Sequence, residues 1–306
     1  MRPRRMVTEN FRGAILMVLS MALFALEDMF IKLMTLGLPY GQVLSMVGAA
    51  GFLAFWASIL LRRQRFWTRA LLHPLVLLRN LCEIVGAIGF TAALALSDLS
   101  STSAILQALP LFIVLGAALF LGEPVGWRRC SAIAVGFAGV LLIVRPGLAA
   151  FQPVSLMALA AVVALAVRDL ATRRIPPGIR SDQIAGSAFL AILLGGLATW
   201  VATGQPAVRP GAVQLGQLAG GMVVGVGGYV LLVAATRVGD AVAVAPYRYA
   251  RLVFALIVAF LVFDERPDLP TLAGAALIVA SGCYAMWREA VLRRRRLREA
   301  GFATAS

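Results

Sequence analysis

Charged side chains interrupt several long apolar stretches of this chain, and these residues are the ones that could do chemistry. Four acids and five bases have this setting: Glu27, Asp28, Glu83, Asp169, Lys32, Arg79, Arg168, Arg248 and Arg251. If the stretches cross a bilayer, each such charge costs at least about 2.5–3.5 kcal/mol near the midplane. Each side chain should therefore face a partner, a wet cavity or the protein interior, as residues of binding sites and proton relays do.

Two pairs of these charges lie at similar depth in different apolar stretches. Arg79 and Glu83 lie about two to three turns into one predicted helix, and Arg248 and Arg251 lie about as deep in another. The four together carry net positive charge. One interpretation is a structural charge network in which Arg79 neutralises Glu83. The other is a binding site, with Glu83 and Arg79 among its residues.

The segment around the second pair favours the binding site. Pro246 interrupts the helix, and Tyr247 adds an aromatic ring beside the two arginines. A guanidinium binds carboxylate or phosphate in a forked geometry and stacks on rings. We therefore expect Arg251, Arg248 and Tyr247, with an unneutralised guanidinium among them, to contact a substrate bearing an anionic or planar group.

Local spacing predicts two ion pairs near helix ends. Asp28 with Lys32, and Asp169 with Arg173, have the i,i+4 acid-first order that places both groups on one helix face. Each pair could anchor its helix, or Asp28 and Asp169 could serve in coupling or gating. Glu27 stands outside this pairing and is a candidate protonatable coupling residue.

Three weaker sets of residues complete the candidates. Gln107 could line a cavity, and so could Tyr229, although the neighbouring Gly221 and Gly225 more simply predict close helix packing. Asp98 and Asp240 precede predicted helices, so N-capping is the better account of both.

The sequence argues against an enzyme and against an ATP-driven pump. Lys32 is the only lysine and has no phosphate-binding-loop context. His73 is the only histidine, which excludes a histidine pair for zinc, and no G-x-S-x-G motif occurs. We expect no catalytic residues, metal or cofactor. A membrane-embedded transferase using Glu83 or Asp169 is the surviving enzyme alternative.

Composition indicates that lipid is the solvent. Of 306 residues, 61% are hydrophobic, and the mean hydropathy is +0.89, against about 45–50% apolar residues in soluble domains. The net charge of +14 does not indicate nucleic acid, because the basic residues cluster at the ends of apolar runs. The three cysteines show no paired spacing and predict no disulfide framework.

The apolar runs predict ten transmembrane helices, since a bilayer core needs about 20 apolar residues per helix. The predicted spans are 11–36, 40–61, 73–96, 100–122, 127–145, 153–173, 183–203, 213–236, 241–263 and 269–288. With both termini cytoplasmic, 20 of the 28 basic residues fall on cytoplasmic segments. Only Arg145, Arg209 and Arg266 fall on segments at the outer side of the membrane. Anionic lipids are the expected contacts of these basic segments.

An internal repeat relates the two halves of the chain at a separation of 141 to 142 residues. Asp28 matches Asp169, and further along Gly86, Asp98, Phe112 and Glu123 match Gly228, Asp240, Phe254 and Glu265. Each repeat holds five helices, an odd number, so the second copy enters the membrane from the opposite side. We expect repeats at 1–150 and 151–290 and a basic tail at 291–306. Inverted repeats are the structural basis of alternating access around a central site.

The 5+5 duplication, the segment Phe24 to Lys32, and the mirrored segments 120–124 and 262–267 resemble the EamA-domain transporters of the drug/metabolite transporter superfamily. The resemblance covers nearly the whole chain. It implies a permease of the bacterial inner membrane for a small solute such as an amino acid, a vitamin or S-adenosylmethionine, bound between the halves. A channel or a receptor-like membrane protein remains the alternative. The sequence leaves the substrate, the direction, the coupling ion and the oligomeric state open.

Overall fold

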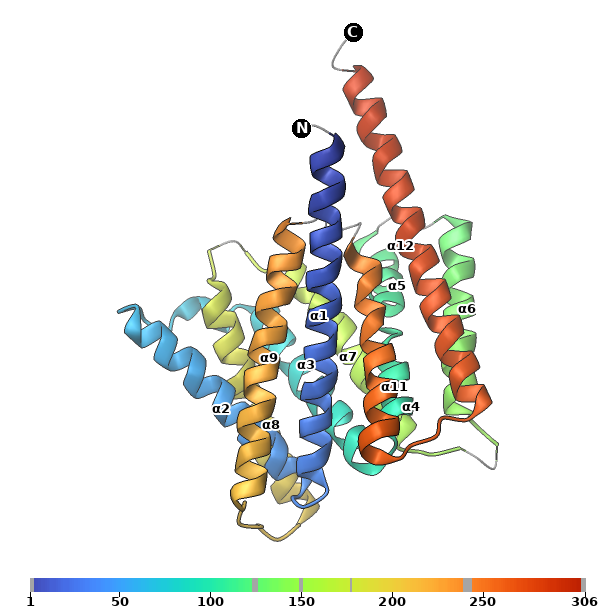
Figure 1. Ribbon diagram of the computed structural model, residues 1–306. Helices are drawn as coiled ribbons and strands as arrows, with labels where there is room; N and C mark the ends of the chain where they lie inside the picture. The colour runs from blue at the N-terminus through green and yellow to red at the C-terminus, as the bar shows by residue number, and fades with distance from the viewer. Residues whose placement is uncertain (1–2, 123–125, 149–150, 177, 239–243, 304–306) are drawn as a thin grey trace.

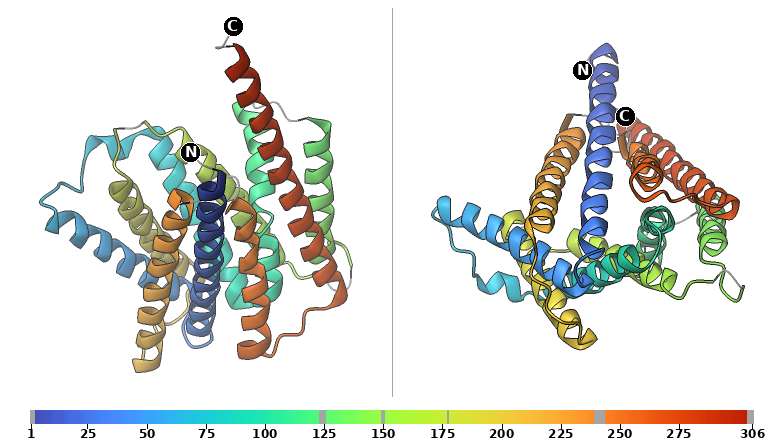
Figure 2. Two further views of the ribbon diagram at one scale, coloured as in Figure 1. Left: turned by 45° about the horizontal axis from the view of Figure 1, so that its top comes forward. Right: turned by 60° about the horizontal axis from the view of Figure 1, so that its bottom comes forward.

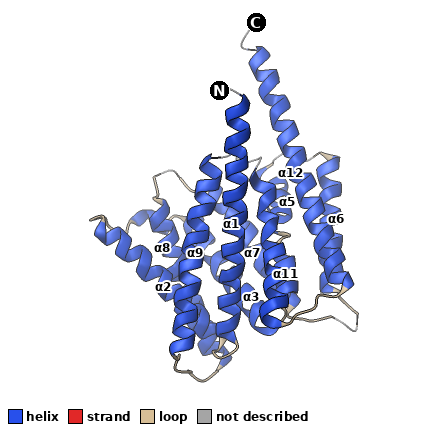
Figure 3. Ribbon diagram, in the orientation of Figure 1, coloured by secondary structure: helices blue, strands red, loops and turns tan. Residues whose placement is uncertain are grey.

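The protein is helical throughout the part of the chain that the structure describes. The computed structural model describes residues 3–122, 126–148, 151–176, 178–238 and 244–303. Within these ranges no strand occurs (Figure 3). A helix satisfies its backbone N–H and C=O groups within one segment, which a bilayer interior requires. The predicted all-α class is confirmed.

The helices follow one another with short connections. The first half contains α1 (Pro3–Thr35), α2 (Tyr40–Leu61), the 3₁₀ turn η1 (Arg69–Leu72), α3 (Pro74–Leu96), α4 (Leu99–Leu106), α5 (Leu109–Leu121) and α6 (Trp127–Val144). The second half contains α7 (Ser155–Arg173), α8 (Ser181–Thr203), α9 (Ala212–Val238), the 3₁₀ turn η2 (Ala245–Tyr249), α11 (Ala250–Phe263) and α12 (Leu269–Ala303).

Nine segments among the described residues are long and apolar enough to cross a membrane. They correspond to nine of the ten predicted spans. The remaining one is α6, an 18-residue helix whose apolar part, Cys130–Val144, is shorter. The start of α1 and the end of α12 extend from the same face of the bundle (Figure 1).

Two of the spans are broken, and proline accounts for the position of each break. The span Leu99–Phe120 is divided into α4 and α5 just before Pro110, which has no N–H to donate and clashes with the preceding turn. In the other half Pro246 lies in η2, a 3₁₀ turn that leads into α11. The interruption that Pro246 predicts is confirmed.

Helices of one half pack mainly on helices of the other. The most extensive contacts join α1 with α9, α2 with α8, α3 with α7, and α6 with α12. The α2–α8 and α6–α12 pairs lie at opposite ends of the molecule (Figures 1 and 2). At α6–α12 the backbones touch, because a Cβ at Gly139 would lie 2.7 Å from Gly274 O, and one at Gly274 would lie 2.6 Å from Gly139 O. The breaks before α5 and α11 thus lie inside a bundle that both halves build.

Candidate functional site

Asp28 and Arg251 form a buried ion pair that joins the two halves. The Arg251 guanidinium of α11 donates Nη2 to both Asp28 carboxylate oxygens at 2.8 Å and Nε to Oδ2 at 3.1 Å. Asp28, on α1, is 2% exposed. The Arg251 guanidinium also lies 5.5 Å from the centre of the Phe24 ring. Arg251 is therefore not the expected unneutralised guanidinium, because a bidentate carboxylate already holds it.

Lys32 likewise reaches across to the second half rather than to its own helix. Its Nζ donates to Glu265 Oε1 at 2.9 Å and to Ser97 O at 2.7 Å. The predicted Asp28–Lys32 pair was therefore wrong. An i,i+4 pair contributes only about 0.2–0.5 kcal/mol, so partners on other helices decide the pairing of both residues.

Glu265 also caps the first half of the broken span. Its carboxylate accepts from Leu99 N at 2.8 Å and Ser100 N at 2.9 Å, at the start of α4. Asp98 occupies the N-cap position but makes no capping bond, so its predicted role was wrong. Asp240, its repeat counterpart, lies outside the described residues. Burial raises the pKa of the Glu265 carboxyl, but the bonds from Ser100 N, Lys32 Nζ and Leu99 N hold that pKa below its usual range.

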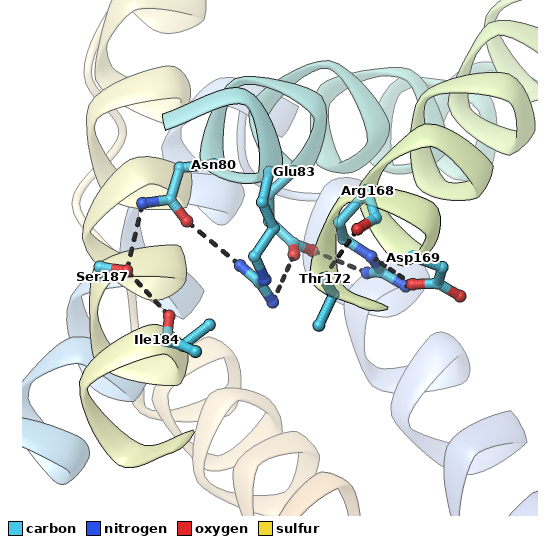
Figure 4. Close-up of polar contacts among 8 residues, drawn as sticks. Asn80, Glu83, Arg168, Asp169, Thr172, Ile184 and Ser187 are labelled. Atoms are coloured by element: carbon cyan, nitrogen blue, oxygen red, sulfur yellow. Dashed lines mark hydrogen bonds and ion pairs between the residues drawn. The ribbon is translucent and has the colours of Figure 1, made fainter. Parts of the chain in front are cut away.

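A second network of charges connects α3 with α7. Glu83 accepts from Arg79 at 3.2 Å, one turn away, and from Arg168 at 3.0 Å across the interface (Figure 4). Arg168 also pairs with Asp169 at 2.7 Å. The predicted Arg79–Glu83 ion pair is confirmed. The predicted Asp169–Arg173 pair was wrong, because Arg168 takes the carboxylate and Arg173 is exposed.

A chain of amides and hydroxyls extends this network to α8. Arg79 Nη1 donates to Asn80 Oδ1 at 3.1 Å, and Asn80 Nδ2 donates to Ser187 Oγ at 3.1 Å (Figure 4). The Arg79 Nε remains buried without an acceptor among the described residues. Arg79 and Arg168 therefore hold the Glu83 carboxylate from two sides, and Asn80 links Arg79 to Ser187.

Arg248 is the guanidinium that these networks leave without a partner. No hydrogen bond or ion pair joins it to any other described residue, and it is exposed. It nevertheless lies within electrostatic reach of Arg251 and of Arg168 and Asp169, so it stands between the two groups of charges. We call Asp28, Arg251, Arg79, Glu83, Arg168, Asp169 and Arg248 the central charge cluster.

The two helix breaks meet beside this cluster. Gln107, at the end of α4, is 8% exposed and donates Nε2 to the backbone oxygen of Tyr249 at 3.5 Å. The Tyr249 hydroxyl is buried without a partner among the described residues. Tyr247, two residues before it in η2, is 46% exposed. Broken helices of this kind present free backbone groups at the centre of many transporters.

Two candidates lie apart from these contacts. Tyr229 on α9 is 57% exposed and forms none of the bonds of the central charge cluster. Glu27 faces α9 and forms no hydrogen bond or ion pair with another described residue, although Asp28 and Arg251 lie within electrostatic reach. Within the described ranges no group of three or more His, Cys, Asp and Glu could hold a metal ion.

Sequence reasoning missed two contacts of this site. Glu265 was visible as a repeat-matched acid, but nothing local pointed to Lys32 as its partner. Arg168 was recognised as an intramembrane charge, yet its bond to Glu83, 85 residues away, had no signal in the sequence. Both contacts link elements distant in the chain.

Comparison with known proteins places the chain among transporters. The EamA-like transporter family matches residues 11–145 and again 152–287. The chain is 29% identical to an S-adenosylmethionine uptake transporter of Rickettsia felis over 78% of this chain and 82% of the other. It is 30% identical to a riboflavin transporter of Rhizobium johnstonii over 93% of both chains. It is 28% identical to the pseudopaline exporter CntI of Pseudomonas aeruginosa over 90% of this chain and 96% of the other.

A solved crystal structure shares the fold. It superposes with a TM-score of 0.59 at 21% identity, covering 91% of this chain and 98% of the other. Together with the apolar helices, these matches make the chain a multi-pass membrane protein, consistent with the cytoplasmic membrane. Because the family matches each half of the chain in turn, the protein belongs to the EamA-like transporter family, within the drug/metabolite transporter superfamily.

Proposed function

We propose that the protein is a secondary active transporter that moves a small organic solute across the cytoplasmic membrane by alternating access. In this proposal ten helices, α6 included, cross the membrane as two inverted repeats, with both ends cytoplasmic. The proposal contains no catalytic step, cofactor or metal.

The pattern of helix packing supports alternating access. The α1–α9 contact in one half of the repeat scheme has the α3–α7 contact as its counterpart, while α2–α8 and α6–α12 are their own counterparts. The repeat therefore relates each of these helix pairs either to another of the pairs or to itself. Two halves built this way can exchange conformations and open a central site to either side.

Arg248 carries the assignment of the substrate site. It is an exposed guanidinium at the junction of η2 and α11, without an acceptor among the described residues, while its three neighbouring arginines are all paired. A free guanidinium binds a carboxylate or phosphate through two parallel bonds. Tyr247, exposed one residue away, adds a ring for a planar group. We propose Arg248 as the main contact, with Tyr247 and Gln107 beside it.

Arg251, Arg79 and Glu83 then hold the site in shape. Arg251 is bonded to Asp28, and Glu83 is bonded to Arg79 and Arg168, so in this state neither Arg251 nor Arg79 offers a free guanidinium to a solute. The named relatives carry chemically different solutes. The substrate class here follows from Arg248 and Tyr247: a small solute with a carboxylate, a phosphate or a planar group.

The test is counterflow in proteoliposomes loaded with a metabolite mixture and read by mass spectrometry. We expect saturable exchange of one solute in the wild type, at least tenfold weaker in Arg248→Gln, which corresponds to about 1.4 kcal/mol of lost interaction. Arg266→Gln is the matched control, since Arg266 is 80% exposed outside the spans. Unsaturable flux would identify a channel. No movement of any solute in a folded preparation would reject transport in favour of a receptor-like protein or a transferase.

A further inference from the structure

A small, partly open void lies between α1, α2 and α9, and its lining residue Glu27 neighbours Asp28 of the central charge cluster. Its volume is about 10 Å³, and its polar lining is the Glu27 carboxyl and the Gln217 amide. The rest of the lining is apolar or glycine: Phe30, Ile31, Met34, Val47, Leu218, Gly221 and Met222. A void needs about 10–15 Å³ to hold one water molecule, so this one has room for a single water.

Both polar groups in the void lack partners among the described residues. Gln217 Oε1 is buried and accepts no hydrogen bond. No hydrogen bond or ion pair of Glu27 occurs there either, and Gly225 leaves the space that its carboxyl occupies, since a Cβ at Gly225 would lie 2.6 Å from Glu27 Oε1. The unpaired acceptor Gln217 Oε1 and the Glu27 carboxyl, which has no cation bonded to it, therefore line the same void.

The chemistry of the lining selects the ligand. With the Gln217 amide oriented as in the structure, an ionised Glu27 would present a second acceptor to the buried Oε1, whereas a protonated Glu27 supplies the donor that this oxygen lacks. Hard metal cations take about six oxygen ligands, whereas this void offers oxygens from only two side chains. A proton needs only one carboxyl oxygen to hold it and one acceptor to receive the O–H.

We propose that Glu27 is a proton-binding site, and that the protonated carboxyl donates through one water in the void to Gln217 Oε1. The further claim that this proton is coupled to solute movement rests on the proposed transport function. The charged groups that face Glu27 are Asp28 on its own helix and Arg251 from α11. Arg251 is bonded to Asp28 and forms no ion pair with Glu27. From α2 and α9 the void receives no titratable group.

The charges of the neighbourhood link the proton to an anion. The central charge cluster holds four guanidiniums and three carboxylates, which leaves the one positive charge that Arg248 represents. An ionised Glu27 would cancel this charge, and a protonated Glu27 preserves it. Because such coupling is reciprocal, protonation of Glu27 should tighten binding of an anionic solute, and the bound anion should tighten the hold on the proton.

Infrared spectroscopy of the full-length protein in lipid tests the proton site without any substrate. At neutral pH the wild type should show a carboxylic-acid C=O band that shifts in heavy water, and Glu27→Gln should lose it. Asp264→Asn is the control, since this carboxylate is 86% exposed and should leave the band unchanged. Gln217→Leu removes the acceptor and should move the band to the higher frequency of a carboxyl without a hydrogen bond.

Three results would overturn the proton site. They are the absence of the band in the wild type, its survival in Glu27→Gln, and its loss when sodium chloride replaces choline chloride, which would assign the void to sodium. Because Glu27→Gln keeps the shape of a protonated carboxyl, it should fold, and a melting curve checks this.

Transport measurements then address the coupling. In proteoliposomes, accumulation of the exchanged solute under an imposed pH gradient should fall in Glu27→Gln to the level seen without a gradient, while counterflow exchange persists. Gradient-driven accumulation that survives in Glu27→Gln would reject the coupling. A Glu27 band without transport of any solute would reject the transport proposal alone, whereas a working carrier without the band would reject the proton site alone.

Discussion

Gln107 and Tyr249 are repeat counterparts, 142 residues apart, and they contact each other directly at the two helix breaks. A pair of equivalent positions can meet only where the axis relating the two halves passes between them. The contact therefore locates the centre of the duplicated structure at the ends of α4 and η2. Arg248 neighbours Tyr249 there, which is where an inverted-repeat carrier holds its solute.

The packing behind Tyr249 gives a first prediction. A Cβ at Gly282 would lie 1.7 Å from the Tyr249 hydroxyl oxygen and 2.5 Å from Cζ. Gly282→Ala should therefore lower stability by about 1–3 kcal/mol through overpacking. Tyr249→Phe should stay within about 1 kcal/mol of wild type, because the buried hydroxyl has no partner among the described residues. Thermal melting in detergent measures both.

The double variant makes this prediction specific. Tyr249→Phe should recover part, but not all, of the loss in Gly282→Ala, since the ring carbon still crowds the new methyl group. Gly216→Ala is the control, because no atom of the described residues lies within 4 Å of a Cβ there. Full additivity of the two changes would show that the Gly282 effect does not pass through Tyr249.

The Asp28–Arg251 pair gives a second prediction. Arg251→Ala should cost about 3–5 kcal/mol, because it leaves a carboxylate that is 2% exposed without its bidentate partner. Removing both charges, as Asp28→Asn with Arg251→Gln, should be less damaging than Arg251→Ala. The exposed pair Asp264–Arg266, 3.9 Å apart, is the matched control, and its removal should change the melting temperature little. Equal costs for the two pairs would contradict the buried-pair interpretation.

Features fixed by local sequence could be predicted. The length of apolar runs gives the helices, Pro246 gives the break at η2, and the spacing of Arg79 and Glu83 gives their ion pair. Each depends on a few neighbouring residues or on the solubility of one segment in lipid. The repeat separation also follows from sequence matching alone.

Pairings between the halves could not be predicted. Asp28 finds Arg251 across 223 residues, and Lys32 finds Glu265 across 233. Local i,i+4 spacing predicted that Asp28 and Lys32 would pair with each other on their own helix. A charge-assisted bond in a low-dielectric interior is stronger than a surface i,i+4 pair, so tertiary packing overrides the local preference. For the same reason the sequence did not show which of Arg248 and Arg251 has a carboxylate partner.

The Arg145–Asp268 pair gives a third prediction, on pH. A hydrogen bond from Arg145 lowers the pKa of Asp268 to about 2 from an ordinary value of 3.8. A carboxyl with a lowered pKa contributes stability above its ordinary value and loses it as pH falls through the lowered one. The contribution should therefore fade between about pH 4 and pH 2. Because the Asp268 side chain is 51% exposed, Asp268→Asn should cost less than about 1 kcal/mol at neutral pH and remove this fading.

The Lys32–Glu265 pair gives a fourth prediction, on access to the centre. It ties the end of α1 to the start of α4 at the face opposite the start of α1 (Figure 1), the outer face in the proposed orientation. Glu265→Gln should loosen this closure. In a background without the three native cysteines, Gln107→Cys should then react several-fold faster with a membrane-impermeant maleimide added from outside.

The pH dependence of this closure separates it from the proton site. Since the pKa of Glu265 lies below its ordinary value of 4.5, the carboxylate stays ionised between pH 5 and 8 and the closure should hold throughout that range. Labelling of Gln107→Cys from outside should therefore change little between pH 8 and pH 5 when Glu265 is present. Acceleration at pH 5 in the wild-type background, with none in Glu27→Gln, would show instead that proton binding at Glu27 opens the outer face.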